Sequence, residues 1–316
     1  MSLDSSTDTA HLIPANARLR RSRRLWRVLA FLALAIAVLA AVARFGMEQG
    51  AVGDSIARIE IFGTITTDPQ RVAAFKRVAE DDSVKAVIVS INSPGGSTAG
   101  GEEIYESLMA LRAEKPVVAV IHELGASAAY MTAIGTDRIF SRRLSIVGSI
   151  GVLYQHVNAG KLLETIGVDL DKVQTGPLKA EPDFDEPLEG PARESLQALV
   201  NDSFEWFVDI VAERRGLTRP QTLALADGRI MTGRVGIETG LIDAVGGEAE
   251  AIDWLEAERE LAADLPVRTW YPLPDRSLFS IWDLILGEAR ASLGLPARGP
   301  IALDGLLSLW QVGPSL

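Results

Sequence analysis

Two short turns contain the residue types that could do chemistry in this 316-residue chain. The first, Asn92-Ser93-Pro94-Gly95-Gly96-Ser97, follows an apolar run and precedes a helical pattern. A Gly-Gly pair at such a junction exposes backbone N–H groups at a helix start, where an anion or an oxyanion can be held. The turn lacks the lysine of a phosphate-binding loop, which argues against nucleotide binding. Taken alone, it also fits an ordinary strand-to-helix turn.

The second turn, Gly125 to Tyr130, carries a serine flanked by small residues at another strand-to-helix junction. A peptide backbone can approach Ser127 closely there, and the N–H of Ala128 would point toward an oxyanion formed on the substrate. This is the logic of a nucleophile elbow without the usual G-x-S-x-G sequence. The alternative is that Ser127 only caps the N-terminus of the helix.

A serine nucleophile needs a base, and this chain offers few candidates. It has no cysteine and three histidines, which excludes thiolate chemistry and disulfides and argues against a His-rich metal cluster. The histidines beyond residue 50 are His122 and His156. Of six lysines, five have the positions of solvated charges, but Lys179 follows Thr175-Gly176-Pro177-Leu178 in a turn with small and apolar neighbours. Desolvation lowers a lysine pKa, which allows the neutral amine to take a hydroxyl proton.

Alternating strand and helix patterns must position these turns. The run Ala86-Val87-Ile88-Val89 is apolar on both faces, as in a buried parallel strand. Repeated alternation of strands and helices predicts an α/β fold with a largely parallel sheet. Gly176–Gly190 is a loop rich in proline and acidic residues, and an amphipathic helix is predicted over Pro191–Arg215. The predicted strands are Ile56–Thr66, Lys85–Ile91, Pro116–Ile121, Arg138–Phe140, Ile146–Tyr154 and Asp169–Gln174, and the other predicted helices are Pro69–Glu80, Gly101–Ala113, a short one near Ala126, and Asn158–Ile166.

The formal net charge of −11 hides a split along the chain. Residues 1–50 hold seven arginines, no lysine and three acidic residues, for a charge of +4. The remaining 24 basic and 39 acidic residues give −15. A chain that is basic only at its start and acidic afterwards is not a nucleic-acid binder overall.

An apolar run explains the basic start. Every residue from Val28 to Ala43 is apolar, which is just long enough to cross a bilayer as a helix. Six arginines between residues 18 and 27 precede it, so the N-terminus is expected to stay cytoplasmic and the rest to be exported. The alternative is a cleaved secretory signal, because Ala41-Val42-Ala43 resembles a cleavage site.

Six short segments follow one another along the chain in a specific order and spacing. They are Asn92-Ser93-Pro94-Gly95-Gly96, Ala126-Ser127-Ala128-Ala129-Tyr130, Gly148-Ser149-Ile150-Gly151-Val152, Thr175-Gly176-Pro177-Leu178-Lys179, Asp227-Gly228-Arg229 with Thr232-Gly233-Arg234, and Gly240-Leu241-Ile242-Asp243. Together they resemble the signal peptide peptidase A family of bacterial membrane-anchored serine proteases. The resemblance covers roughly residues 55–260 together with the N-terminal anchor, and it implies a fold like that of the Clp protease subunit and the crotonases, a spiral of ββα units.

The resemblance implies a Ser/Lys dyad, with Ser127 as nucleophile and Lys179 as general base. Ser149 would hold the Lys179 amine by a hydrogen bond. The backbone N–H groups of Ala128 and of Gly95 or Gly96 would form the oxyanion hole, and no metal or organic cofactor is implied. Many members have Gly-Gly after the nucleophile where this chain has Ala128-Ala129, which keeps the main-chain donor but could narrow the adjacent pocket.

The expected organisation is a basic cytoplasmic tail (1–24), a single transmembrane signal-anchor (25–46), an exported peptidase domain (47–265) and a C-terminal tail with an apolar helical segment (266–316). This places the chain in the bacterial inner membrane with a periplasmic catalytic domain. The expected substrates are short apolar peptides such as cleaved signal peptides. The resemblance also implies a ring-like homo-oligomer whose dyads form within or between subunits.

Three other functions remain open from the sequence. A Clp-like Ser-His protease would use His156 as base with Asp169 or Asp171 as third member. A catalytically silent membrane scaffold would assemble rings and bind partner proteins. An acyl-CoA enzyme of the crotonase type would share the fold, although an exported acidic domain with a Ser/Lys pair disfavours it.

Overall fold

The computed structural model describes residues 26–27, 29–35, 53–272 and 307–309. The chain divides into two units, residues 1–53 and residues 54–316. In the first unit, residues 26–27 and 29–35 are helical and exposed. Within the described part of the chain, no helix is both long and apolar enough to cross a membrane. Most of the predicted anchor and the predicted apolar helix around Trp282 lie outside the described residues.

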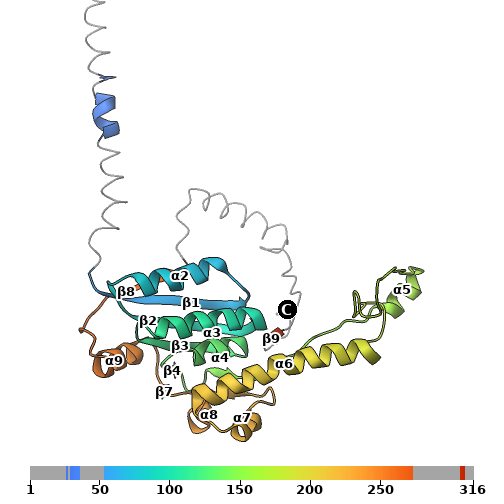
Figure 1. The fold of residues 1–316 in the computed structure, drawn as a ribbon. Helices are drawn as coiled ribbons and strands as arrows, with labels where there is room; N and C mark the ends of the chain where they lie inside the picture. Colours follow the sequence, from blue (N-terminus) through green and yellow to red (C-terminus); the bar gives the residue numbers. More distant parts are fainter. Residues whose placement is uncertain (1–25, 28, 36–52, 273–306, 310–316) are drawn as a thin grey trace, which may run out of the picture. The chain divides into compact units, whose positions relative to one another are not determined.

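A mixed sheet forms the centre of the second unit (Figure 1). Its strand order is β6-β5-β3-β2-β1-β8, with β4 pairing with β3 and β7, and β9 pairing with β2. Most pairs are parallel, and the antiparallel ones are β5 with β6 and β2 with β9. The strands are β1 (Ser55–Ile65), β2 (Val84–Ser97), β3 (Val117–Ala126), β4 (Arg138–Ser141), β5 (Ile146–Gly148), β6 (Ile230–Thr232), β7 (Ala244–Val245), β8 (Val267–Tyr271) and β9 (Leu307–Leu309).

Helices cover both faces of this sheet. Val87, Val89 and Ile91 of β2 belong to one core cluster, to which α2, α3, α4 and α6 contribute. Ala86 and Ile88 of the same strand belong to a second cluster with α9. The helices are α2 (Pro69–Glu80), α3 (Thr98–Arg112), α4 (Ala128–Ile134), α5 (Gly160–Ile166), α6 (Gly190–Arg215), α7 (Arg219–Leu225), α8 (Gly233–Glu238) and α9 (Glu248–Glu258).

The predicted α/β class with a largely parallel sheet is confirmed, and most predicted elements are present. Two strands extend beyond their predicted ends. β2 continues to Ser97, so the predicted turn Asn92–Ser97 has strand conformation, with a break in its register to β1 between Asn92 and Gly95. β3 continues to Ala126, directly before Ser127. β5 ends at Gly148 rather than at Tyr154. The finer expectation of a spiral of ββα units stays an expectation drawn from the resemblance.

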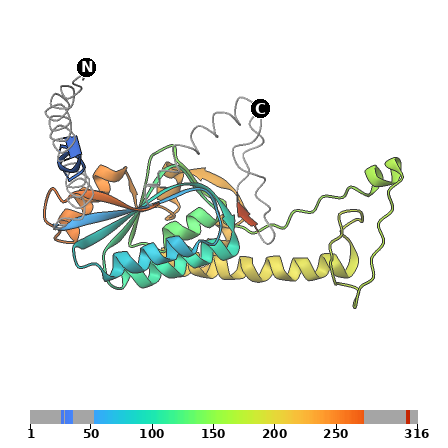
Figure 2. The same ribbon diagram turned by 90° about the horizontal axis from the view of Figure 1, so that it is seen from above.

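The segment between β5 and α6 differs most from the prediction. Residues 153–189, which we call the arm, project from the sheet beside α6 (Figures 1 and 2). The predicted strand Asp169–Gln174 is wrong, because these residues have no strand conformation. A strand needs a neighbour to pair its backbone groups. Residues 169–174 are exposed on an arm that carries no other strand, so that neighbour is missing.

The helix α6 is amphipathic as predicted, but only its C-terminal half is packed. Phe207, Val208 and Val211 are fully buried in the core. Leu199, in the N-terminal half of the helix, is exposed. Among the described residues, nothing buries this apolar side chain in the first half of α6.

A buried hydroxyl ties α4 to the C-terminal part of the domain, and its removal is a test of the fold. The Tyr130 hydroxyl is fully buried and donates to the Leu241 carbonyl oxygen at 2.8 Å. Tyr130→Phe leaves that carbonyl unpaired, so the free energy of unfolding in urea should fall by about 1–3 kcal/mol. Tyr105→Phe is the matched control, because the Tyr105 hydroxyl has no hydrogen-bond partner among the described residues and its ring packs edge-on against Trp206. Equal losses in the two variants would contradict this reading.

Candidate active site

The turn at the end of β2 is held by close contacts with β1. Gly95 has φ +101°, a conformation that L side chains rarely adopt. A Cβ atom on Gly96 would lie 1.9 Å from the Ile65 carbonyl oxygen, so only glycine fits there. The Gly95 N–H donates to the buried Ser93 hydroxyl at 3.1 Å. Because that N–H is already engaged, the structure favours Gly96 over Gly95 as the candidate oxyanion donor of this turn.

Ser127 lies between the end of β3 and the start of α4, in a strained backbone conformation. Its φ is +60° and its ψ is −122°, and it is 1% exposed. Such a conformation costs about 1–3 kcal/mol in a non-glycine residue and marks many active sites. Its N–H donates to the Gly148 carbonyl oxygen at 2.8 Å. The Ser127 side chain makes no capping hydrogen bond to α4, so the geometry does not support the alternative that it serves as a helix cap.

Ala128 begins α4 directly after Ser127. The first N–H groups of a helix have no partner within the helix, so the Ala128 N–H is positioned as a main-chain donor. The Ala128 methyl is fully buried and faces α3, where a Cβ on Gly101 would lie 3.1 Å from it. Gly101 therefore makes room for an alanine at this position, and in this chain the methyl is directed at α3.

Ser149 follows the end of β5, which is the neighbour of β3. The pairing of Ala126 with Gly148 puts Ser127 and Ser149 at the ends of adjacent parallel strands. Ser149 also has a positive φ of +52° and is 8% exposed. The structure thus brings these two predicted site residues together.

The backbone around Ser149 is fixed by Arg229 of the Asp227-Gly228-Arg229 motif. The Ser149 N–H donates to the Arg229 carbonyl oxygen at 2.8 Å. The Arg229 side chain folds back onto Asp227, with Nε 2.7 Å from Oδ1. Hydrogen bonds from Arg229 lower the pKa of the Asp227 carboxyl to about 2, so this pair stays charged at neutral pH. This motif is part of the family resemblance in the sequence, and no structural or catalytic role was predicted for it.

The three turns lie in order along one edge of the sheet. The strand order β5-β3-β2 places Ser149, Ser127 and the Gly95–Gly96 turn side by side at the carboxyl ends of their strands. The pairing of Ser93 with Gly125 joins the last two turns directly. Parallel strands present their carboxyl ends at the same edge, which is why residues far apart in sequence meet here.

An extended segment of the same chain lies along this edge. β9 runs antiparallel to β2, with Leu307 opposite Ser97, Ser308 opposite Gly96 and Leu309 opposite Gly95. The residues next to the candidate oxyanion turn therefore accept a peptide strand, and that strand runs from Ser97 toward Gly95.

Lys179 is on the arm, apart from the sheet edge. It is exposed, and its N–H closes a turn by donating to the Gly176 carbonyl oxygen at 3.0 Å. His156 is also on the arm, with Nε2 3.0 Å from the Glu186 carbonyl oxygen. Asp169 and Asp171 are exposed there too. The two candidate bases, Lys179 and His156, are therefore both on the arm. The sheet carries the other predicted site residues, which are Ser127, Ser149, Ala128 and the Gly95–Gly96 turn.

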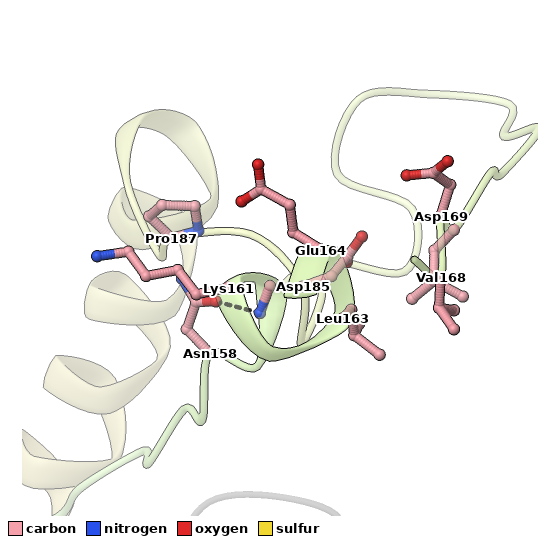
Figure 3. Close-up of a pocket in the computed structure, with 10 residues that line it drawn as sticks. Asn158, Lys161, Leu163, Glu164, Val168, Asp169, Asp185 and Pro187 are labelled. Carbon is pink, nitrogen blue, oxygen red and sulfur yellow. Dashed lines mark hydrogen bonds between the residues drawn. The ribbon is translucent and has the colours of Figure 1, made fainter. Parts of the chain in front are cut away.

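A hollow on the arm is separate from these turns (Figure 3). The Glu164 and Asp185 carboxylates lie around it, and Asn158 accepts a hydrogen bond from the Gly160 N–H at 2.8 Å. It contains neither of the two serines. Among the described residues, no group of His, Asp or Glu side chains is arranged to hold a metal ion.

The chain matches known peptidases over most of the second unit. A sequence model of peptidase family S49 matches residues 109–262. A protein named as a protease in Synechocystis is 37% identical over 200 residues, which span 63% of this chain and 72% of that protein. A protein named as signal peptide peptidase SppA in Enterococcus faecium is 30% identical over 232 residues, which span 68% of this chain and 67% of that protein.

A longer relative and a solved structure show the extent of the similarity. Protease 4 of Haemophilus influenzae is 31% identical over 263 residues, which span 79% of this chain and 40% of that protein. A ClpP1 mutant from Listeria monocytogenes covers 61% of this chain and 92% of its own, with 15% identity and a TM-score of 0.41.

Proposed function

Because the chain belongs to peptidase family S49 and is a serine peptidase, we propose that Ser127 is its nucleophile and Lys179 its general base. The observation that carries this proposal is the backbone of Ser127. Its positive φ at a strand-to-helix junction puts the residue beside the Ala128 N–H and the Gly96 turn. Those are the surroundings that acyl transfer to a hydroxyl requires.

The proposed reaction is peptide-bond hydrolysis through an acyl-enzyme. Neutral Lys179 takes the Ser127 proton while Oγ attacks the peptide carbonyl carbon, and the resulting oxyanion accepts hydrogen bonds from the Ala128 and Gly96 N–H groups. The C–N bond then breaks and the Lys179 ammonium protonates the leaving amine. Water then attacks the ester carbonyl carbon and gives a proton to Lys179. The ester C–Oγ bond breaks, the Lys179 ammonium returns that proton to Ser127 Oγ, and the carboxylic acid leaves.

The substrate is proposed to bind as an added strand on β2. A strand in the position of β9 gives main-chain hydrogen bonds independently of sequence, with pockets for alternate side chains. Its direction carries the peptide from Ser97 toward the Gly95–Gly96 turn, where the scissile carbonyl would enter the oxyanion hole. This arrangement supports extended peptides as the substrate class. Short apolar peptides, including cleaved signal peptides, are our proposal for the natural ones.

The base is proposed to come from a neighbouring copy of the chain. The arm exposes several large apolar side chains, of which Val173 is fully exposed, and α5 buries none of its residues. Large exposed apolar surface in a folded protein marks an interaction site. A second copy that covered the arm and the exposed half of α6 would also desolvate the Lys179 turn, which is what a lysine base needs.

The chain is proposed to be anchored in the bacterial inner membrane with residues 47–265 on the periplasmic side. The apolar run Val28–Ala43 and the arginines before it support this topology. A membrane-held peptidase would meet short apolar peptides where they accumulate.

The identity of the base can be tested with single substitutions. Lys179→Ala should lower kcat for a fluorogenic apolar peptide by about 10³-fold or more, because a serine hydroxyl without its base is a poor nucleophile. His156→Ala, on the same arm, should retain activity within about threefold. Loss of activity in the His156 variant alone would replace Lys179 by His156 as the proposed base.

The pH dependence of the wild-type enzyme is a second test of the base. On the acid side of the pH profile, activity should rise with pH, since only the deprotonated amine accepts the proton.

Subunit mixing tests whether the dyad forms between chains. Ser127→Ala and Lys179→Ala proteins are each expected to be inactive. When the two are mixed in detergent and reassembled, sites that combine Ser127 of one chain with Lys179 of another should restore about a quarter of wild-type activity. A dyad within one chain would give no recovery, provided that co-purification of two differently tagged variants shows mixed oligomers.

The absence of cysteine makes the topology directly measurable. Single cysteines are introduced by Ser5→Cys before the apolar run and by Asp82→Cys at an exposed turn of the domain. A membrane-impermeant maleimide should label the Asp82→Cys protein in intact spheroplasts and the Ser5→Cys protein only after lysis. The reverse pattern would contradict the proposed orientation.

A further inference from the structure

The buried hydroxyl of Ser93 connects β1 to the candidate oxyanion turn. Ser93 is 0% exposed, and its Oγ donates to the Gly63 carbonyl oxygen at 2.5 Å. The same Oγ accepts the Gly95 N–H at 3.1 Å. One side chain thus fixes the backbone of two glycines, both with positive φ, on neighbouring strands.

These bonds occur where the sheet is irregular. On one side, the register between β1 and β2 moves from Phe62–Asn92 to Thr64–Gly95, which leaves Gly63, Ser93 and Pro94 without paired positions. On the other side, the register between β2 and β3 shifts between Ile91 and Ser93. Ser93 then pairs with Gly125, which lies two residues before Ser127 in the chain. The register between β1 and β2 resumes at Thr64–Gly95 and Ile65–Gly96. Within the irregular stretch before these pairs, the Ser93 hydroxyl bonds the backbone of both strands.

Pro94 and Gly95 do not offer an N–H group to the substrate. Pro94 has no N–H. The Gly95 N–H is directed at Ser93 Oγ, and the next N–H along the chain is that of Gly96. Where Gly96 points depends on the Gly95 dihedral angles, and the Ser93 bond holds those angles.

We propose that Ser93 is a positioning residue for catalysis, whose hydroxyl orients the Gly96 N–H toward the oxyanion. The inference rests on the proposed acyl-transfer function of Ser127. An oxyanion donor is effective only if it is preorganised at about 2.7–3.1 Å from the developing charge. Without the Ser93 hydroxyl, the Gly96 N–H would still be present but would no longer be held in the direction of the oxyanion. The transition state would therefore lose more stabilisation than the bound substrate.

The test compares Ser93→Ala with Ser90→Ala. Ser90 is the matched control, because it is a buried serine of the same strand whose Oγ instead pairs with His122 Nε2 at 2.8 Å. In Ser93→Ala, kcat for the fluorogenic peptide should fall about 10–100-fold with KM within about threefold. The inhibition constant of a matching peptide aldehyde, whose adduct with serine carries the oxyanion, should rise by the same factor as kcat falls. Ser90→Ala should leave both quantities within about threefold.

Ser93→Cys avoids the cavity that alanine leaves, because the larger sulfur fills the place of the hydroxyl while the thiol is a weak donor and acceptor. It should show the same loss in kcat with a melting temperature close to that of wild type. Wild-type kcat and aldehyde affinity in the folded Ser93 variants, or a change in KM alone, would overturn the inference. Failure of the proposed function is distinguishable from this, since Ser127→Ala would then keep full activity or the aldehyde would not inhibit the wild-type enzyme.

Discussion

The candidate site depends on the pairing of β3 with β5. The hydrogen bond from the Ser127 N–H to the Gly148 carbonyl oxygen continues this ladder by one residue beyond its last paired position. It forces the chain to turn sharply at Ser127 and to begin α4 immediately afterwards. That bond helps to hold Ser127 at φ +60°, a conformation that L-residues rarely adopt. The serine, the helix N-terminus behind it and Ser149 beside it are thus positioned by one short parallel strand pair.

The strain at this turn is sustained by the packing around it. All seven residues of α4 are buried, and β2 and β3 are covered on both faces. About 1–3 kcal/mol of backbone strain is small compared with the burial of these elements. The same rigidity explains why the oxyanion turn needs glycine. Gly96 lies against the Ile65 carbonyl oxygen with no room for a side chain, so the oxyanion turn and β1 are held as one body.

The sequence predicted the sheet better than the arm. Strands such as β2 were recognisable because they are apolar on both faces, and the glycine turns marked the ends of β2 and β3. The strand expected at residues 169–174 was wrong because its apolar residues, Leu170 and Val173, are exposed in the described part of the structure. A single sequence does not distinguish a residue buried in its own core from one available to another subunit. The role of Ser93 also escaped prediction, since a serine in a glycine turn gives no sign of which backbone groups its hydroxyl will bind.

In the proposed mechanism, the nucleophile and the base lie on different parts of the chain, the sheet and the arm. The nucleophile and the donors are built into the rigid domain, whereas the candidate bases are on a segment with little core of its own. Assembly would therefore complete the site and activate the peptidase together, since the same contacts that cover the arm would desolvate its lysine. An unassembled chain would carry an aligned serine without a base.

The central claim, that the strained serine is the nucleophile, is tested most directly by the position of a covalent adduct. Detergent-purified wild-type protein is treated with a fluorophosphonate and digested, and the modified peptide is identified by mass spectrometry. The account predicts one adduct, on Ser127, and no adduct in a Ser127→Ala protein treated in parallel. An adduct on another serine, or none on an enzyme that still cleaves peptides, would contradict it.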